Sequence, residues 1–231
     1  MAKLSPIRAS IPLLPNLTLL NRGKVRDNYI IQLPYLAPYR NLLLPWASDG
    51  ISIFDFVLNA LVPQKGQILT ALTHFWLKHL EGYGINTHLV AAGAEIDSFL
   101  PPELQDNADI QSRALVVQRL EMALKEFIVR GYLTGSGLAA YRKNGAVCGH
   151  LLPPGLEDGD EIPAIDTPTT KAEDGHDEHM DAAAIRAQYP EETYQALRIY
   201  SIGRTIAYTR GIILADTKLE FGIHNGDVIL I

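Results

Sequence analysis

The last twenty residues of the chain constrain its fold more than any other part of the sequence. Charged and apolar side chains alternate over residues 216–223, and residues two apart in an extended strand share a face. Asn225-Gly226 follows, and this pair supplies the two positive φ angles of a type I′ turn. The sequence therefore predicts a β-hairpin over 218–231. A buried strand is expected just before it, at the apolar run Ile212–Ala215.

The alternation also places the charged side chains of this segment on one face of the strand. Asp216, Lys218 and Glu220 are predicted to share one face of the strand. Carboxylates at the end of a buried strand lie where ligands of layered α/β proteins gather. The carboxylates suit Mg²⁺, and the lysine would offset an anionic substrate. The alternative is a half-solvated sheet face of alternating charge.

Two other segments place cationic residues next to glycines, one at 23–27 and one at 129–137. In Gly23-Lys24-Val25-Arg26-Asp27, both basic residues are expected on one face of a strand that begins where a backbone can approach a phosphate. The pattern G-x-x-x-x-G-K-[ST] of a Walker loop is absent from the sequence. A plain surface strand with two basic residues remains the alternative.

The second group is Val129–Gly137. Arg130 leaves an apolar strand and Ser136 lies between glycines at a predicted helix start, which favours an oxyanion or phosphate pocket. An N-capping serine beside an arginine ion pair fits equally well. The polar run 167–178 predicts a substrate loop, while the absence of G-x-S-x-G argues against serine-nucleophile catalysis. Cys148 is expected to be a small buried apolar residue.

Composition limits the function classes. A length of 231 residues predicts one large domain or two small lobes. The formal net charge of −6 argues against electrostatic capture of nucleic acid or an anionic membrane. A single cysteine excludes an intrachain disulfide, and no run approaches 18 apolar residues. A cytoplasmic protein with neither nucleic-acid nor membrane partners is expected.

Periodicity predicts the remaining elements. Strands are expected around Gly23 and at 42–47, 87–91, 114–117 and 127–129, and helices at 67–82, 138–143 and from Pro190 to about Gly211. The acidic, proline-containing segment 93–112 is predicted to be a surface loop. Segment 149–181 is predicted to be irregular and either functional or disordered.

Several segments, taken in order, resemble the SAICAR synthetase family. They are GKVRDNY (23–29), SDGISIFD (48–55), PQKGQILT (63–70), EFIVRGYLTGSG (126–137), GAVCGHLLPPGL (145–156), TPTTKAEDGHDE (167–178) and GIILADTKLEFG (211–222). The resemblance implies a two-lobed α+β fold with ATP in the cleft between the lobes. An N-terminal antiparallel β lobe, 1–121, would cover the nucleotide, and a larger α/β lobe, 122–231, would hold the substrate and the metal.

The resemblance also implies roles for residues. The ATP-binding positions would be Gly23, Lys24 and Arg26 over the phosphates, with Arg119, Glu121 and Met122 at the adenine. The substrate-binding positions would be Arg130, Ser136, Asp177 and Lys218. Asp216 and Glu220 would hold Mg²⁺, and Lys218 with Asp216 would be catalytic.

The implied reaction joins L-aspartate to the carboxylate of CAIR, giving SAICAR in de novo purine biosynthesis. ATP would convert that carboxylate to an acyl phosphate, which the aspartate amine attacks. Clustered cations, Mg²⁺ and carboxylates suffice for phosphoryl transfer, because it depends on positioning and charge neutralisation.

Two departures from the family pattern keep alternatives open. Gly50 stands where the family motif usually has arginine, and the chain ends at Ile231, before a C-terminal family segment. The alternatives are a truncated or divergent paralogue that binds ATP without turnover, and an amide ligase for another carboxylate and amine. Assembly into a homo-oligomer is also left open.

Overall fold

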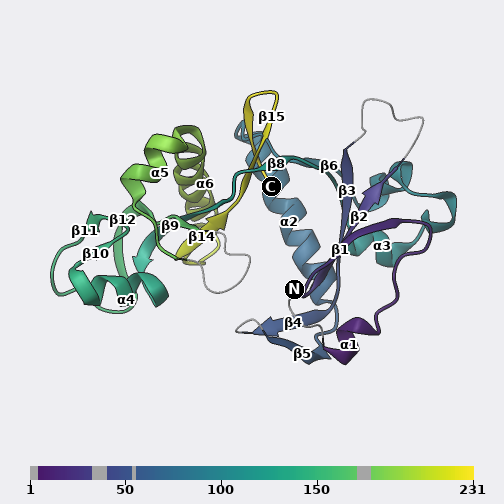
Figure 1. The fold of residues 1–231 in the computed structure, drawn as a ribbon, viewed down its shortest axis with the longest axis horizontal. Coiled ribbons are helices and arrows are strands. Elements are labelled where there is room, and N and C mark those ends of the chain that lie inside the picture. The colour runs from purple at the N-terminus through teal and green to yellow at the C-terminus, as the bar shows by residue number, and fades with distance from the viewer. Residues whose placement is uncertain (1–4, 33–40, 54–55, 171–177) are drawn as a thin grey trace. The chain divides into compact units, whose positions relative to one another are not determined.

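The computed structural model describes residues 5–32, 41–53, 56–170 and 178–231 (Figure 1). The chain divides into two compact units. The first contains Met1–Gly82 and Thr87–Leu120, and the second contains Tyr83–Asn86 and Glu121–Ile231. The units are nearly equal in length, whereas the resemblance implies a larger second lobe.

An antiparallel sheet forms the centre of the first unit, in the strand order β1-β2-β3-β7-β6. Its strands are β1 (Thr18–Arg22), β2 (Arg26–Ile31), β3 (Leu42–Ala47), β6 (Leu89–Ala92) and β7 (Leu115–Gln118). The unit also contains α1 (Pro6–Ala9), α2 (Lys65–Gly82) and the hairpin of β4 (Gly50–Ile53) with β5 (Phe56–Leu61). The expected strands and the expected helix of this region are thereby confirmed. In α2, Leu77 and Leu80 are buried, whereas Leu69 and Phe75 are exposed.

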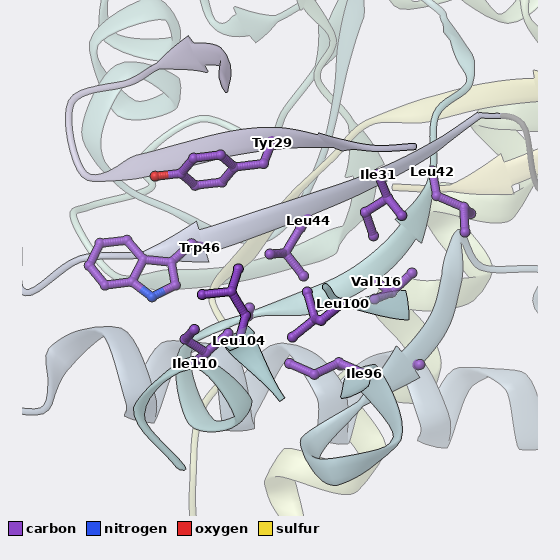
Figure 2. Close-up of a cluster of buried hydrophobic side chains, with 12 residues drawn as sticks. Tyr29, Ile31, Leu42, Leu44, Trp46, Ile96, Leu100, Leu104, Ile110 and Val116 are labelled. Carbon is purple, nitrogen blue, oxygen red and sulfur yellow. The ribbon is translucent and has the colours of Figure 1, made fainter. Parts of the chain in front are cut away.

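The core of the first unit corrects one expectation. Segment 93–112 was predicted to be a surface loop, but it forms the 3₁₀ helices η1 (Gly93–Phe99) and η2 (Pro102–Leu104) and most of α3 (Ala108–Arg113). Its apolar side chains face the alternate residues of β2 and β3 in one buried cluster (Figure 2). The buried members from this segment are Ile96, Leu100, Leu104 and Ile110. Ile96, Leu100 and Leu104 are four residues apart, but the proline pair 101–102 separates two short 3₁₀ helices, so no continuous helix forms.

A central strand organises the second unit. β9 (Lys125–Leu133) pairs with β12 (Asp160–Asp166) and β13 (Thr169–Thr170), and β14 (Asp216–Leu219) also pairs with it. The helices of this unit are α4 (Gly135–Asn144), α5 (Ala182–Gln188) and α6 (Pro190–Tyr208). A separate sheet has the order β16-β15-β8, with β8 (Glu121–Met122), β15 (Phe221–His224) and β16 (Asp227–Leu230), and β10 (Ala146–Val147) pairs with β11 (His150–Leu151).

The C-terminal hairpin is confirmed, and the strand predicted before it is wrong. Asn225 and Gly226 have φ angles of 52° and 89° between β15 and β16, as a type I′ turn requires. The run Ile212–Ala215 is not a strand, and Ile213 is 70% exposed. The chain reaches β9 only at Ala215, whose carbonyl accepts from Gly131 N at 3.0 Å. Asp216 therefore begins a strand, and Glu220 lies just after the end of that strand.

Segment 149–181 is more regular than expected. β12 places Ile162 and Ile165 in a buried cluster. The local sequence did not show this strand, because it forms by pairing with β9, about thirty positions earlier in the chain. Residues 171–177 of this segment lie outside the described structure. Within the described ranges, no helix combines the length and the apolar character needed to cross a membrane.

Candidate functional site

Strand register builds a polar row in the second unit. Arg130 of β9 lies opposite Asp216 of β14, and Ile128 lies opposite Lys218. Facing residues in neighbouring strands project to the same side of a sheet, and residues two apart in a strand share that side. The polar row therefore consists of Glu126 and Arg130 from β9, Thr169 from β13, and Asp216 and Lys218 from β14.

Arg130 is held from three directions. Its side chain is buried, and its Nε donates to Thr167 Oγ1 at 3.0 Å. Nη1 donates to Asp216 Oδ2 at 3.2 Å, and Nη2 donates to Ser136 Oγ at 3.1 Å. A Cβ at Gly137 would lie 3.3 Å from Arg130 Cδ, so this glycine lets the start of α4 approach the guanidinium. The structure thus brings together three residues that the sequence analysis selected.

Lys218 is paired with a carboxylate that the sequence analysis missed. Its Nζ forms an ion pair with Glu126 Oε1. Glu126 is only 4% exposed, and its Oε2 accepts from Thr169 Oγ1 at 3.2 Å. A buried carboxylate needs such partners, because its desolvation is otherwise costly. The available signal was that Glu126 and Arg130, four residues apart, lie on the same face of a strand that also contains apolar residues.

His179 lies beside the same cluster. Its Nε2 is 3.4 Å from Ser136 Oγ, and burial together with the charge of Arg130 lowers the pKa of His179 below its usual value. The neutral imidazole is therefore favoured next to Ser136. Asp177, the remaining expected substrate residue, lies outside the described residues.

Cys148 behaves as a structural residue. Its Sγ lies 3.8 Å from the carbonyl oxygen of Pro168, and burial raises the pKa of the thiol to about 11. The thiolate needed for nucleophilic chemistry is therefore scarce at neutral pH. The expectation of a small apolar residue instead of a nucleophile agrees with this environment, although Cys148 is only partly buried.

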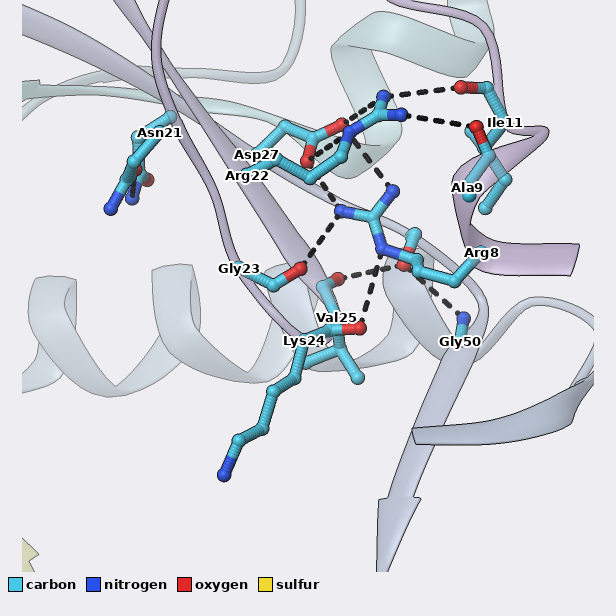
Figure 3. Close-up of polar contacts among 12 residues, drawn as sticks. Arg8, Ala9, Ile11, Asn21, Arg22, Gly23, Lys24, Val25, Asp27 and Gly50 are labelled. Atoms are coloured by element: carbon cyan, nitrogen blue, oxygen red, sulfur yellow. Dashed lines mark hydrogen bonds and ion pairs between the residues drawn. The ribbon is translucent and has the colours of Figure 1, made fainter. Parts of the chain in front are cut away.

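In the first unit, Gly23–Arg26 forms the turn between β1 and β2. Gly23 N donates to the carbonyl oxygen of Arg26 at 2.7 Å. Lys24 lies in this turn and not in a strand, so the expectation that strand alternation places it on one face with Arg26 is wrong. Arg26 is exposed at the first position of β2, and the Lys24 side chain extends away from the buried polar groups under the turn (Figure 3).

The residues expected at the adenine belong to both units: Arg119 to the first, and Glu121 and Met122 to the second. Arg119 is exposed, and its N–H donates to the carbonyl oxygen of Asn41 at 2.7 Å in the first unit. Glu121 and Met122 form β8 of the second unit, opposite Ile223 and Gly222. Both β8 side chains are exposed.

The expected metal ligands do not form a preformed cage. Asp216 is engaged by Arg130, and Glu220 lies just after β14, partly exposed. Among the residues that the structure describes, no group of three or more His, Cys, Asp or Glu side chains is arranged to hold a metal. The oxygen donors fit Mg²⁺, which commonly uses one or two carboxylates and takes its other ligands from water and substrate phosphates.

Comparison with known proteins agrees with these features. A family model described as SAICAR synthetase matches residues 19–231. The phosphoribosylaminoimidazole-succinocarboxamide synthase of Thermodesulfovibrio yellowstonii is 41% identical over 224 residues, covering 94% of this chain and 73% of that protein.

Solved structures give the same result. A SAICAR synthase structure is 34% identical, with a TM-score of 0.81 over 95% of this chain and 74% of the other. The SAICAR synthase of Saccharomyces cerevisiae, solved in complex with SAICAR, is 35% identical, with a TM-score of 0.80 over 95% of this chain and 73% of that one.

Proposed function

The chain belongs to the SAICAR synthetase family, and we propose that the polar row on β9, β13 and β14 is where it holds its anionic substrate. Its activity is that of a SAICAR synthase, an ATP-using ligase of de novo purine biosynthesis. The observation that carries the proposal is the convergence of Arg130, Ser136 and Lys218 on one side of the second unit.

We propose a reaction in two steps. A carboxylate oxygen of CAIR attacks the γ-phosphorus of ATP, the bond from that phosphorus to the ADP oxygen breaks, and an acyl phosphate forms. The amine nitrogen of L-aspartate then attacks the acyl carbon, phosphate leaves with the bonding electron pair, and the nitrogen loses a proton. The products are ADP, phosphate and SAICAR.

The described residues suit the anions of this reaction. The Arg130 guanidinium has a fixed fork of donors, and its contact with Ser136 leaves the serine O–H able to donate to a substrate oxygen. The Lys218 side chain is 54% exposed. Because an ammonium group has three donors, Lys218 can bind a substrate oxygen while it keeps Glu126 as a partner. Asp177 is proposed to join this group.

We propose that Gly23, Lys24 and Arg26 bind the ATP phosphates, with Arg119, Glu121 and Met122 at the adenine. Asp216 and Glu220 would hold Mg²⁺, which when bound would neutralise phosphate charge. Arg130 contacts only one carboxylate oxygen of Asp216, so the other oxygen would be available to the metal. Purine biosynthesis supports a cytoplasmic location, and light scattering would test whether a homo-oligomer forms.

The activity is tested by ADP release with Mg-ATP, CAIR and L-aspartate, each omitted in turn. Release that depends on all three is expected. ATP binding in calorimetry without product would favour the paralogue that lacks turnover. ADP release without CAIR would indicate phosphoryl transfer to water. Release that requires a different added carboxylate and amine in place of CAIR and aspartate would favour a ligase for that pair.

The substrate role of Arg130 is tested with a matched pair of variants. Arg130→Lys keeps the charge and loses the fork, so the KM for CAIR should rise about tenfold or more. Arg186→Lys is the control, because Arg186 forms an ion pair with Asp166 outside the polar row. An equal change in both variants would contradict the proposed role.

A further inference from the structure

We propose that Arg8 is a positioning residue for nucleotide binding, because it holds the carbonyl groups of the turn Gly23–Arg26 toward the protein. The inference rests on the proposed function of this turn in binding the ATP phosphates. It concerns a residue outside the segment 19–231 that matches the family model.

Arg8 is anchored from its own helix. Arg8 belongs to α1, and Ser5 caps this helix. The backbone N–H of Arg8 donates to Ser5 Oγ at 3.3 Å. Ile7 N also donates to Asn59 Oδ1 at 2.9 Å, which ties α1 to β5. The Arg8 side chain is 0% exposed, so it cannot itself contact a ligand in solution.

The guanidinium of Arg8 reaches under the turn (Figure 3). Its Nε donates to the carbonyl oxygen of Lys24 at 3.3 Å, and Nη2 donates to that of Gly23 at 3.4 Å. The remaining donors form an ion pair with the buried carboxylate of Asp27. Burial of a guanidinium is costly without partners of this kind, so the geometry of Arg8 and that of the turn depend on each other.

The other two carbonyl oxygens of the turn are also occupied by the protein. That of Val25 accepts from Ser48 N at 3.0 Å and from Ser48 Oγ at 2.8 Å. That of Arg26 accepts from Gly23 N at 2.7 Å. All four carbonyl oxygens of the turn are therefore directed onto protein donors, and Arg8 holds two of them.

This orientation matters for an anionic ligand. A carbonyl oxygen carries partial negative charge, so an outward-facing carbonyl would repel a phosphate oxygen. With the carbonyls held inward, the charges of Lys24 and Arg26 dominate the potential at the turn. The buried group of Arg8, Arg22 and Asp27 adds one net positive charge beneath it. Arg8 thus makes the turn suitable for phosphates without touching them.

Arg22 provides the matched control. It also pairs with Asp27, through Nε at 3.1 Å and Nη2 at 2.9 Å. Arg22 also donates to the carbonyl oxygens of Ala9 and Ile11, which precede the turn. Arg8→Lys and Arg22→Lys each keep the charge at Asp27, but only the first removes the fork that holds the turn carbonyls.

Calorimetric titration with ADP and with AMP tests the inference, together with KM for ATP and for CAIR. Arg8→Lys should weaken ADP binding about tenfold, weaken AMP binding less, and leave the KM for CAIR unchanged. Arg22→Lys should change ADP affinity by less than about threefold. Equal losses in the two variants, or unchanged ADP affinity in Arg8→Lys, would overturn the role of Arg8.

Two further variants separate the possible failures. Lys24→Ala tests the proposed function itself. If it binds ADP normally, the turn does not bind phosphates and both claims are wrong; if only Arg8→Lys binds normally, the Arg8 inference alone is wrong. Should Arg8→Lys fail to fold, Ser5→Ala loosens the cap of α1 more gently and should weaken ADP binding about twofold. Unchanged binding in that variant would also overturn the inference.

Discussion

At the scale of single residues, the ion pair of Lys218 with Glu126 changes what loss of the lysine should do. Lys218→Ala leaves a buried carboxylate with only Thr169 as its described donor. We expect turnover to be lost and the free energy of unfolding to fall by about 1–3 kcal/mol. ADP release and urea unfolding measure the two effects.

The double variant Lys218→Ala/Glu126→Gln separates these roles. It removes the buried charge, so most of the lost stability should return while activity stays absent. A double variant as unstable as the single one would show that the Glu126 charge is not the cause.

His88 predicts a pH dependence of stability. Burial and the nearby charge of Arg26 lower the pKa of His88 to about 4 in the folded protein, from about 6.5 for an unperturbed histidine. The unfolded state therefore binds the proton more readily. The stability that the neutral imidazole contributes is complete above about pH 6.5 and is lost as the pH falls toward 4.

The expected loss is about 2–3 kcal/mol between pH 7 and pH 4. Urea unfolding at several pH values measures it, and His88→Gln should flatten the profile over this range. His224→Gln is the control, because His224 is exposed. The same slope in wild-type protein and in His88→Gln would contradict the assignment.

At the scale of elements, the chain changes sheets between β14 and β15. β14 pairs with β9, whereas β15 pairs with β8 and β16. The alternating segment 216–223 is therefore not one continuous strand. Phe221 is buried against Phe127, with ring centroids 5.3 Å apart, while Ile223 is 39% exposed.

Alanine substitutions on β15 test this difference in burial between Phe221 and Ile223. Phe221→Ala should lower the free energy of unfolding by about 3–5 kcal/mol, because it empties a buried aromatic position. Ile223→Ala should cost less than about 1.5 kcal/mol, because much of its side chain is already in solvent. Equal losses in thermal or urea unfolding would mean that both residues lie in the core.

At the scale of the whole molecule, Tyr83–Asn86 belongs to the second unit although it lies within the sequence of the first. Ile85 is 3% exposed, and the carbonyl oxygen of Asn86 accepts from Leu230 N at 2.9 Å. Ile85→Ala should therefore destabilise the second unit by about 2–5 kcal/mol. Hydrogen exchange should speed up in β15 and β16 more than in β2 and β3. Faster exchange confined to β2 and β3 would contradict the assignment of Tyr83–Asn86 to the second unit.

Much of the architecture followed from local patterns in the sequence. The paired strands around Gly23, the helix that begins at Pro190, and the Asn225-Gly226 hairpin depend on φ preferences and on periods of two or 3.6 residues, which neighbouring residues determine. The cationic candidates were also visible, because Arg130 follows an apolar strand and Lys218 belongs to a row of alternating charged and apolar residues. The family resemblance supplied their expected roles.

Other features were decided only by tertiary structure. Glu126 meets Lys218 across 92 positions of sequence, and Arg8 meets Asp27 across 19. Segment 93–112 is acidic by composition but buries four apolar side chains against β2 and β3. Local preference describes how a segment folds, whereas the partner of a buried charge or an apolar side chain depends on which distant segment the register places beside it.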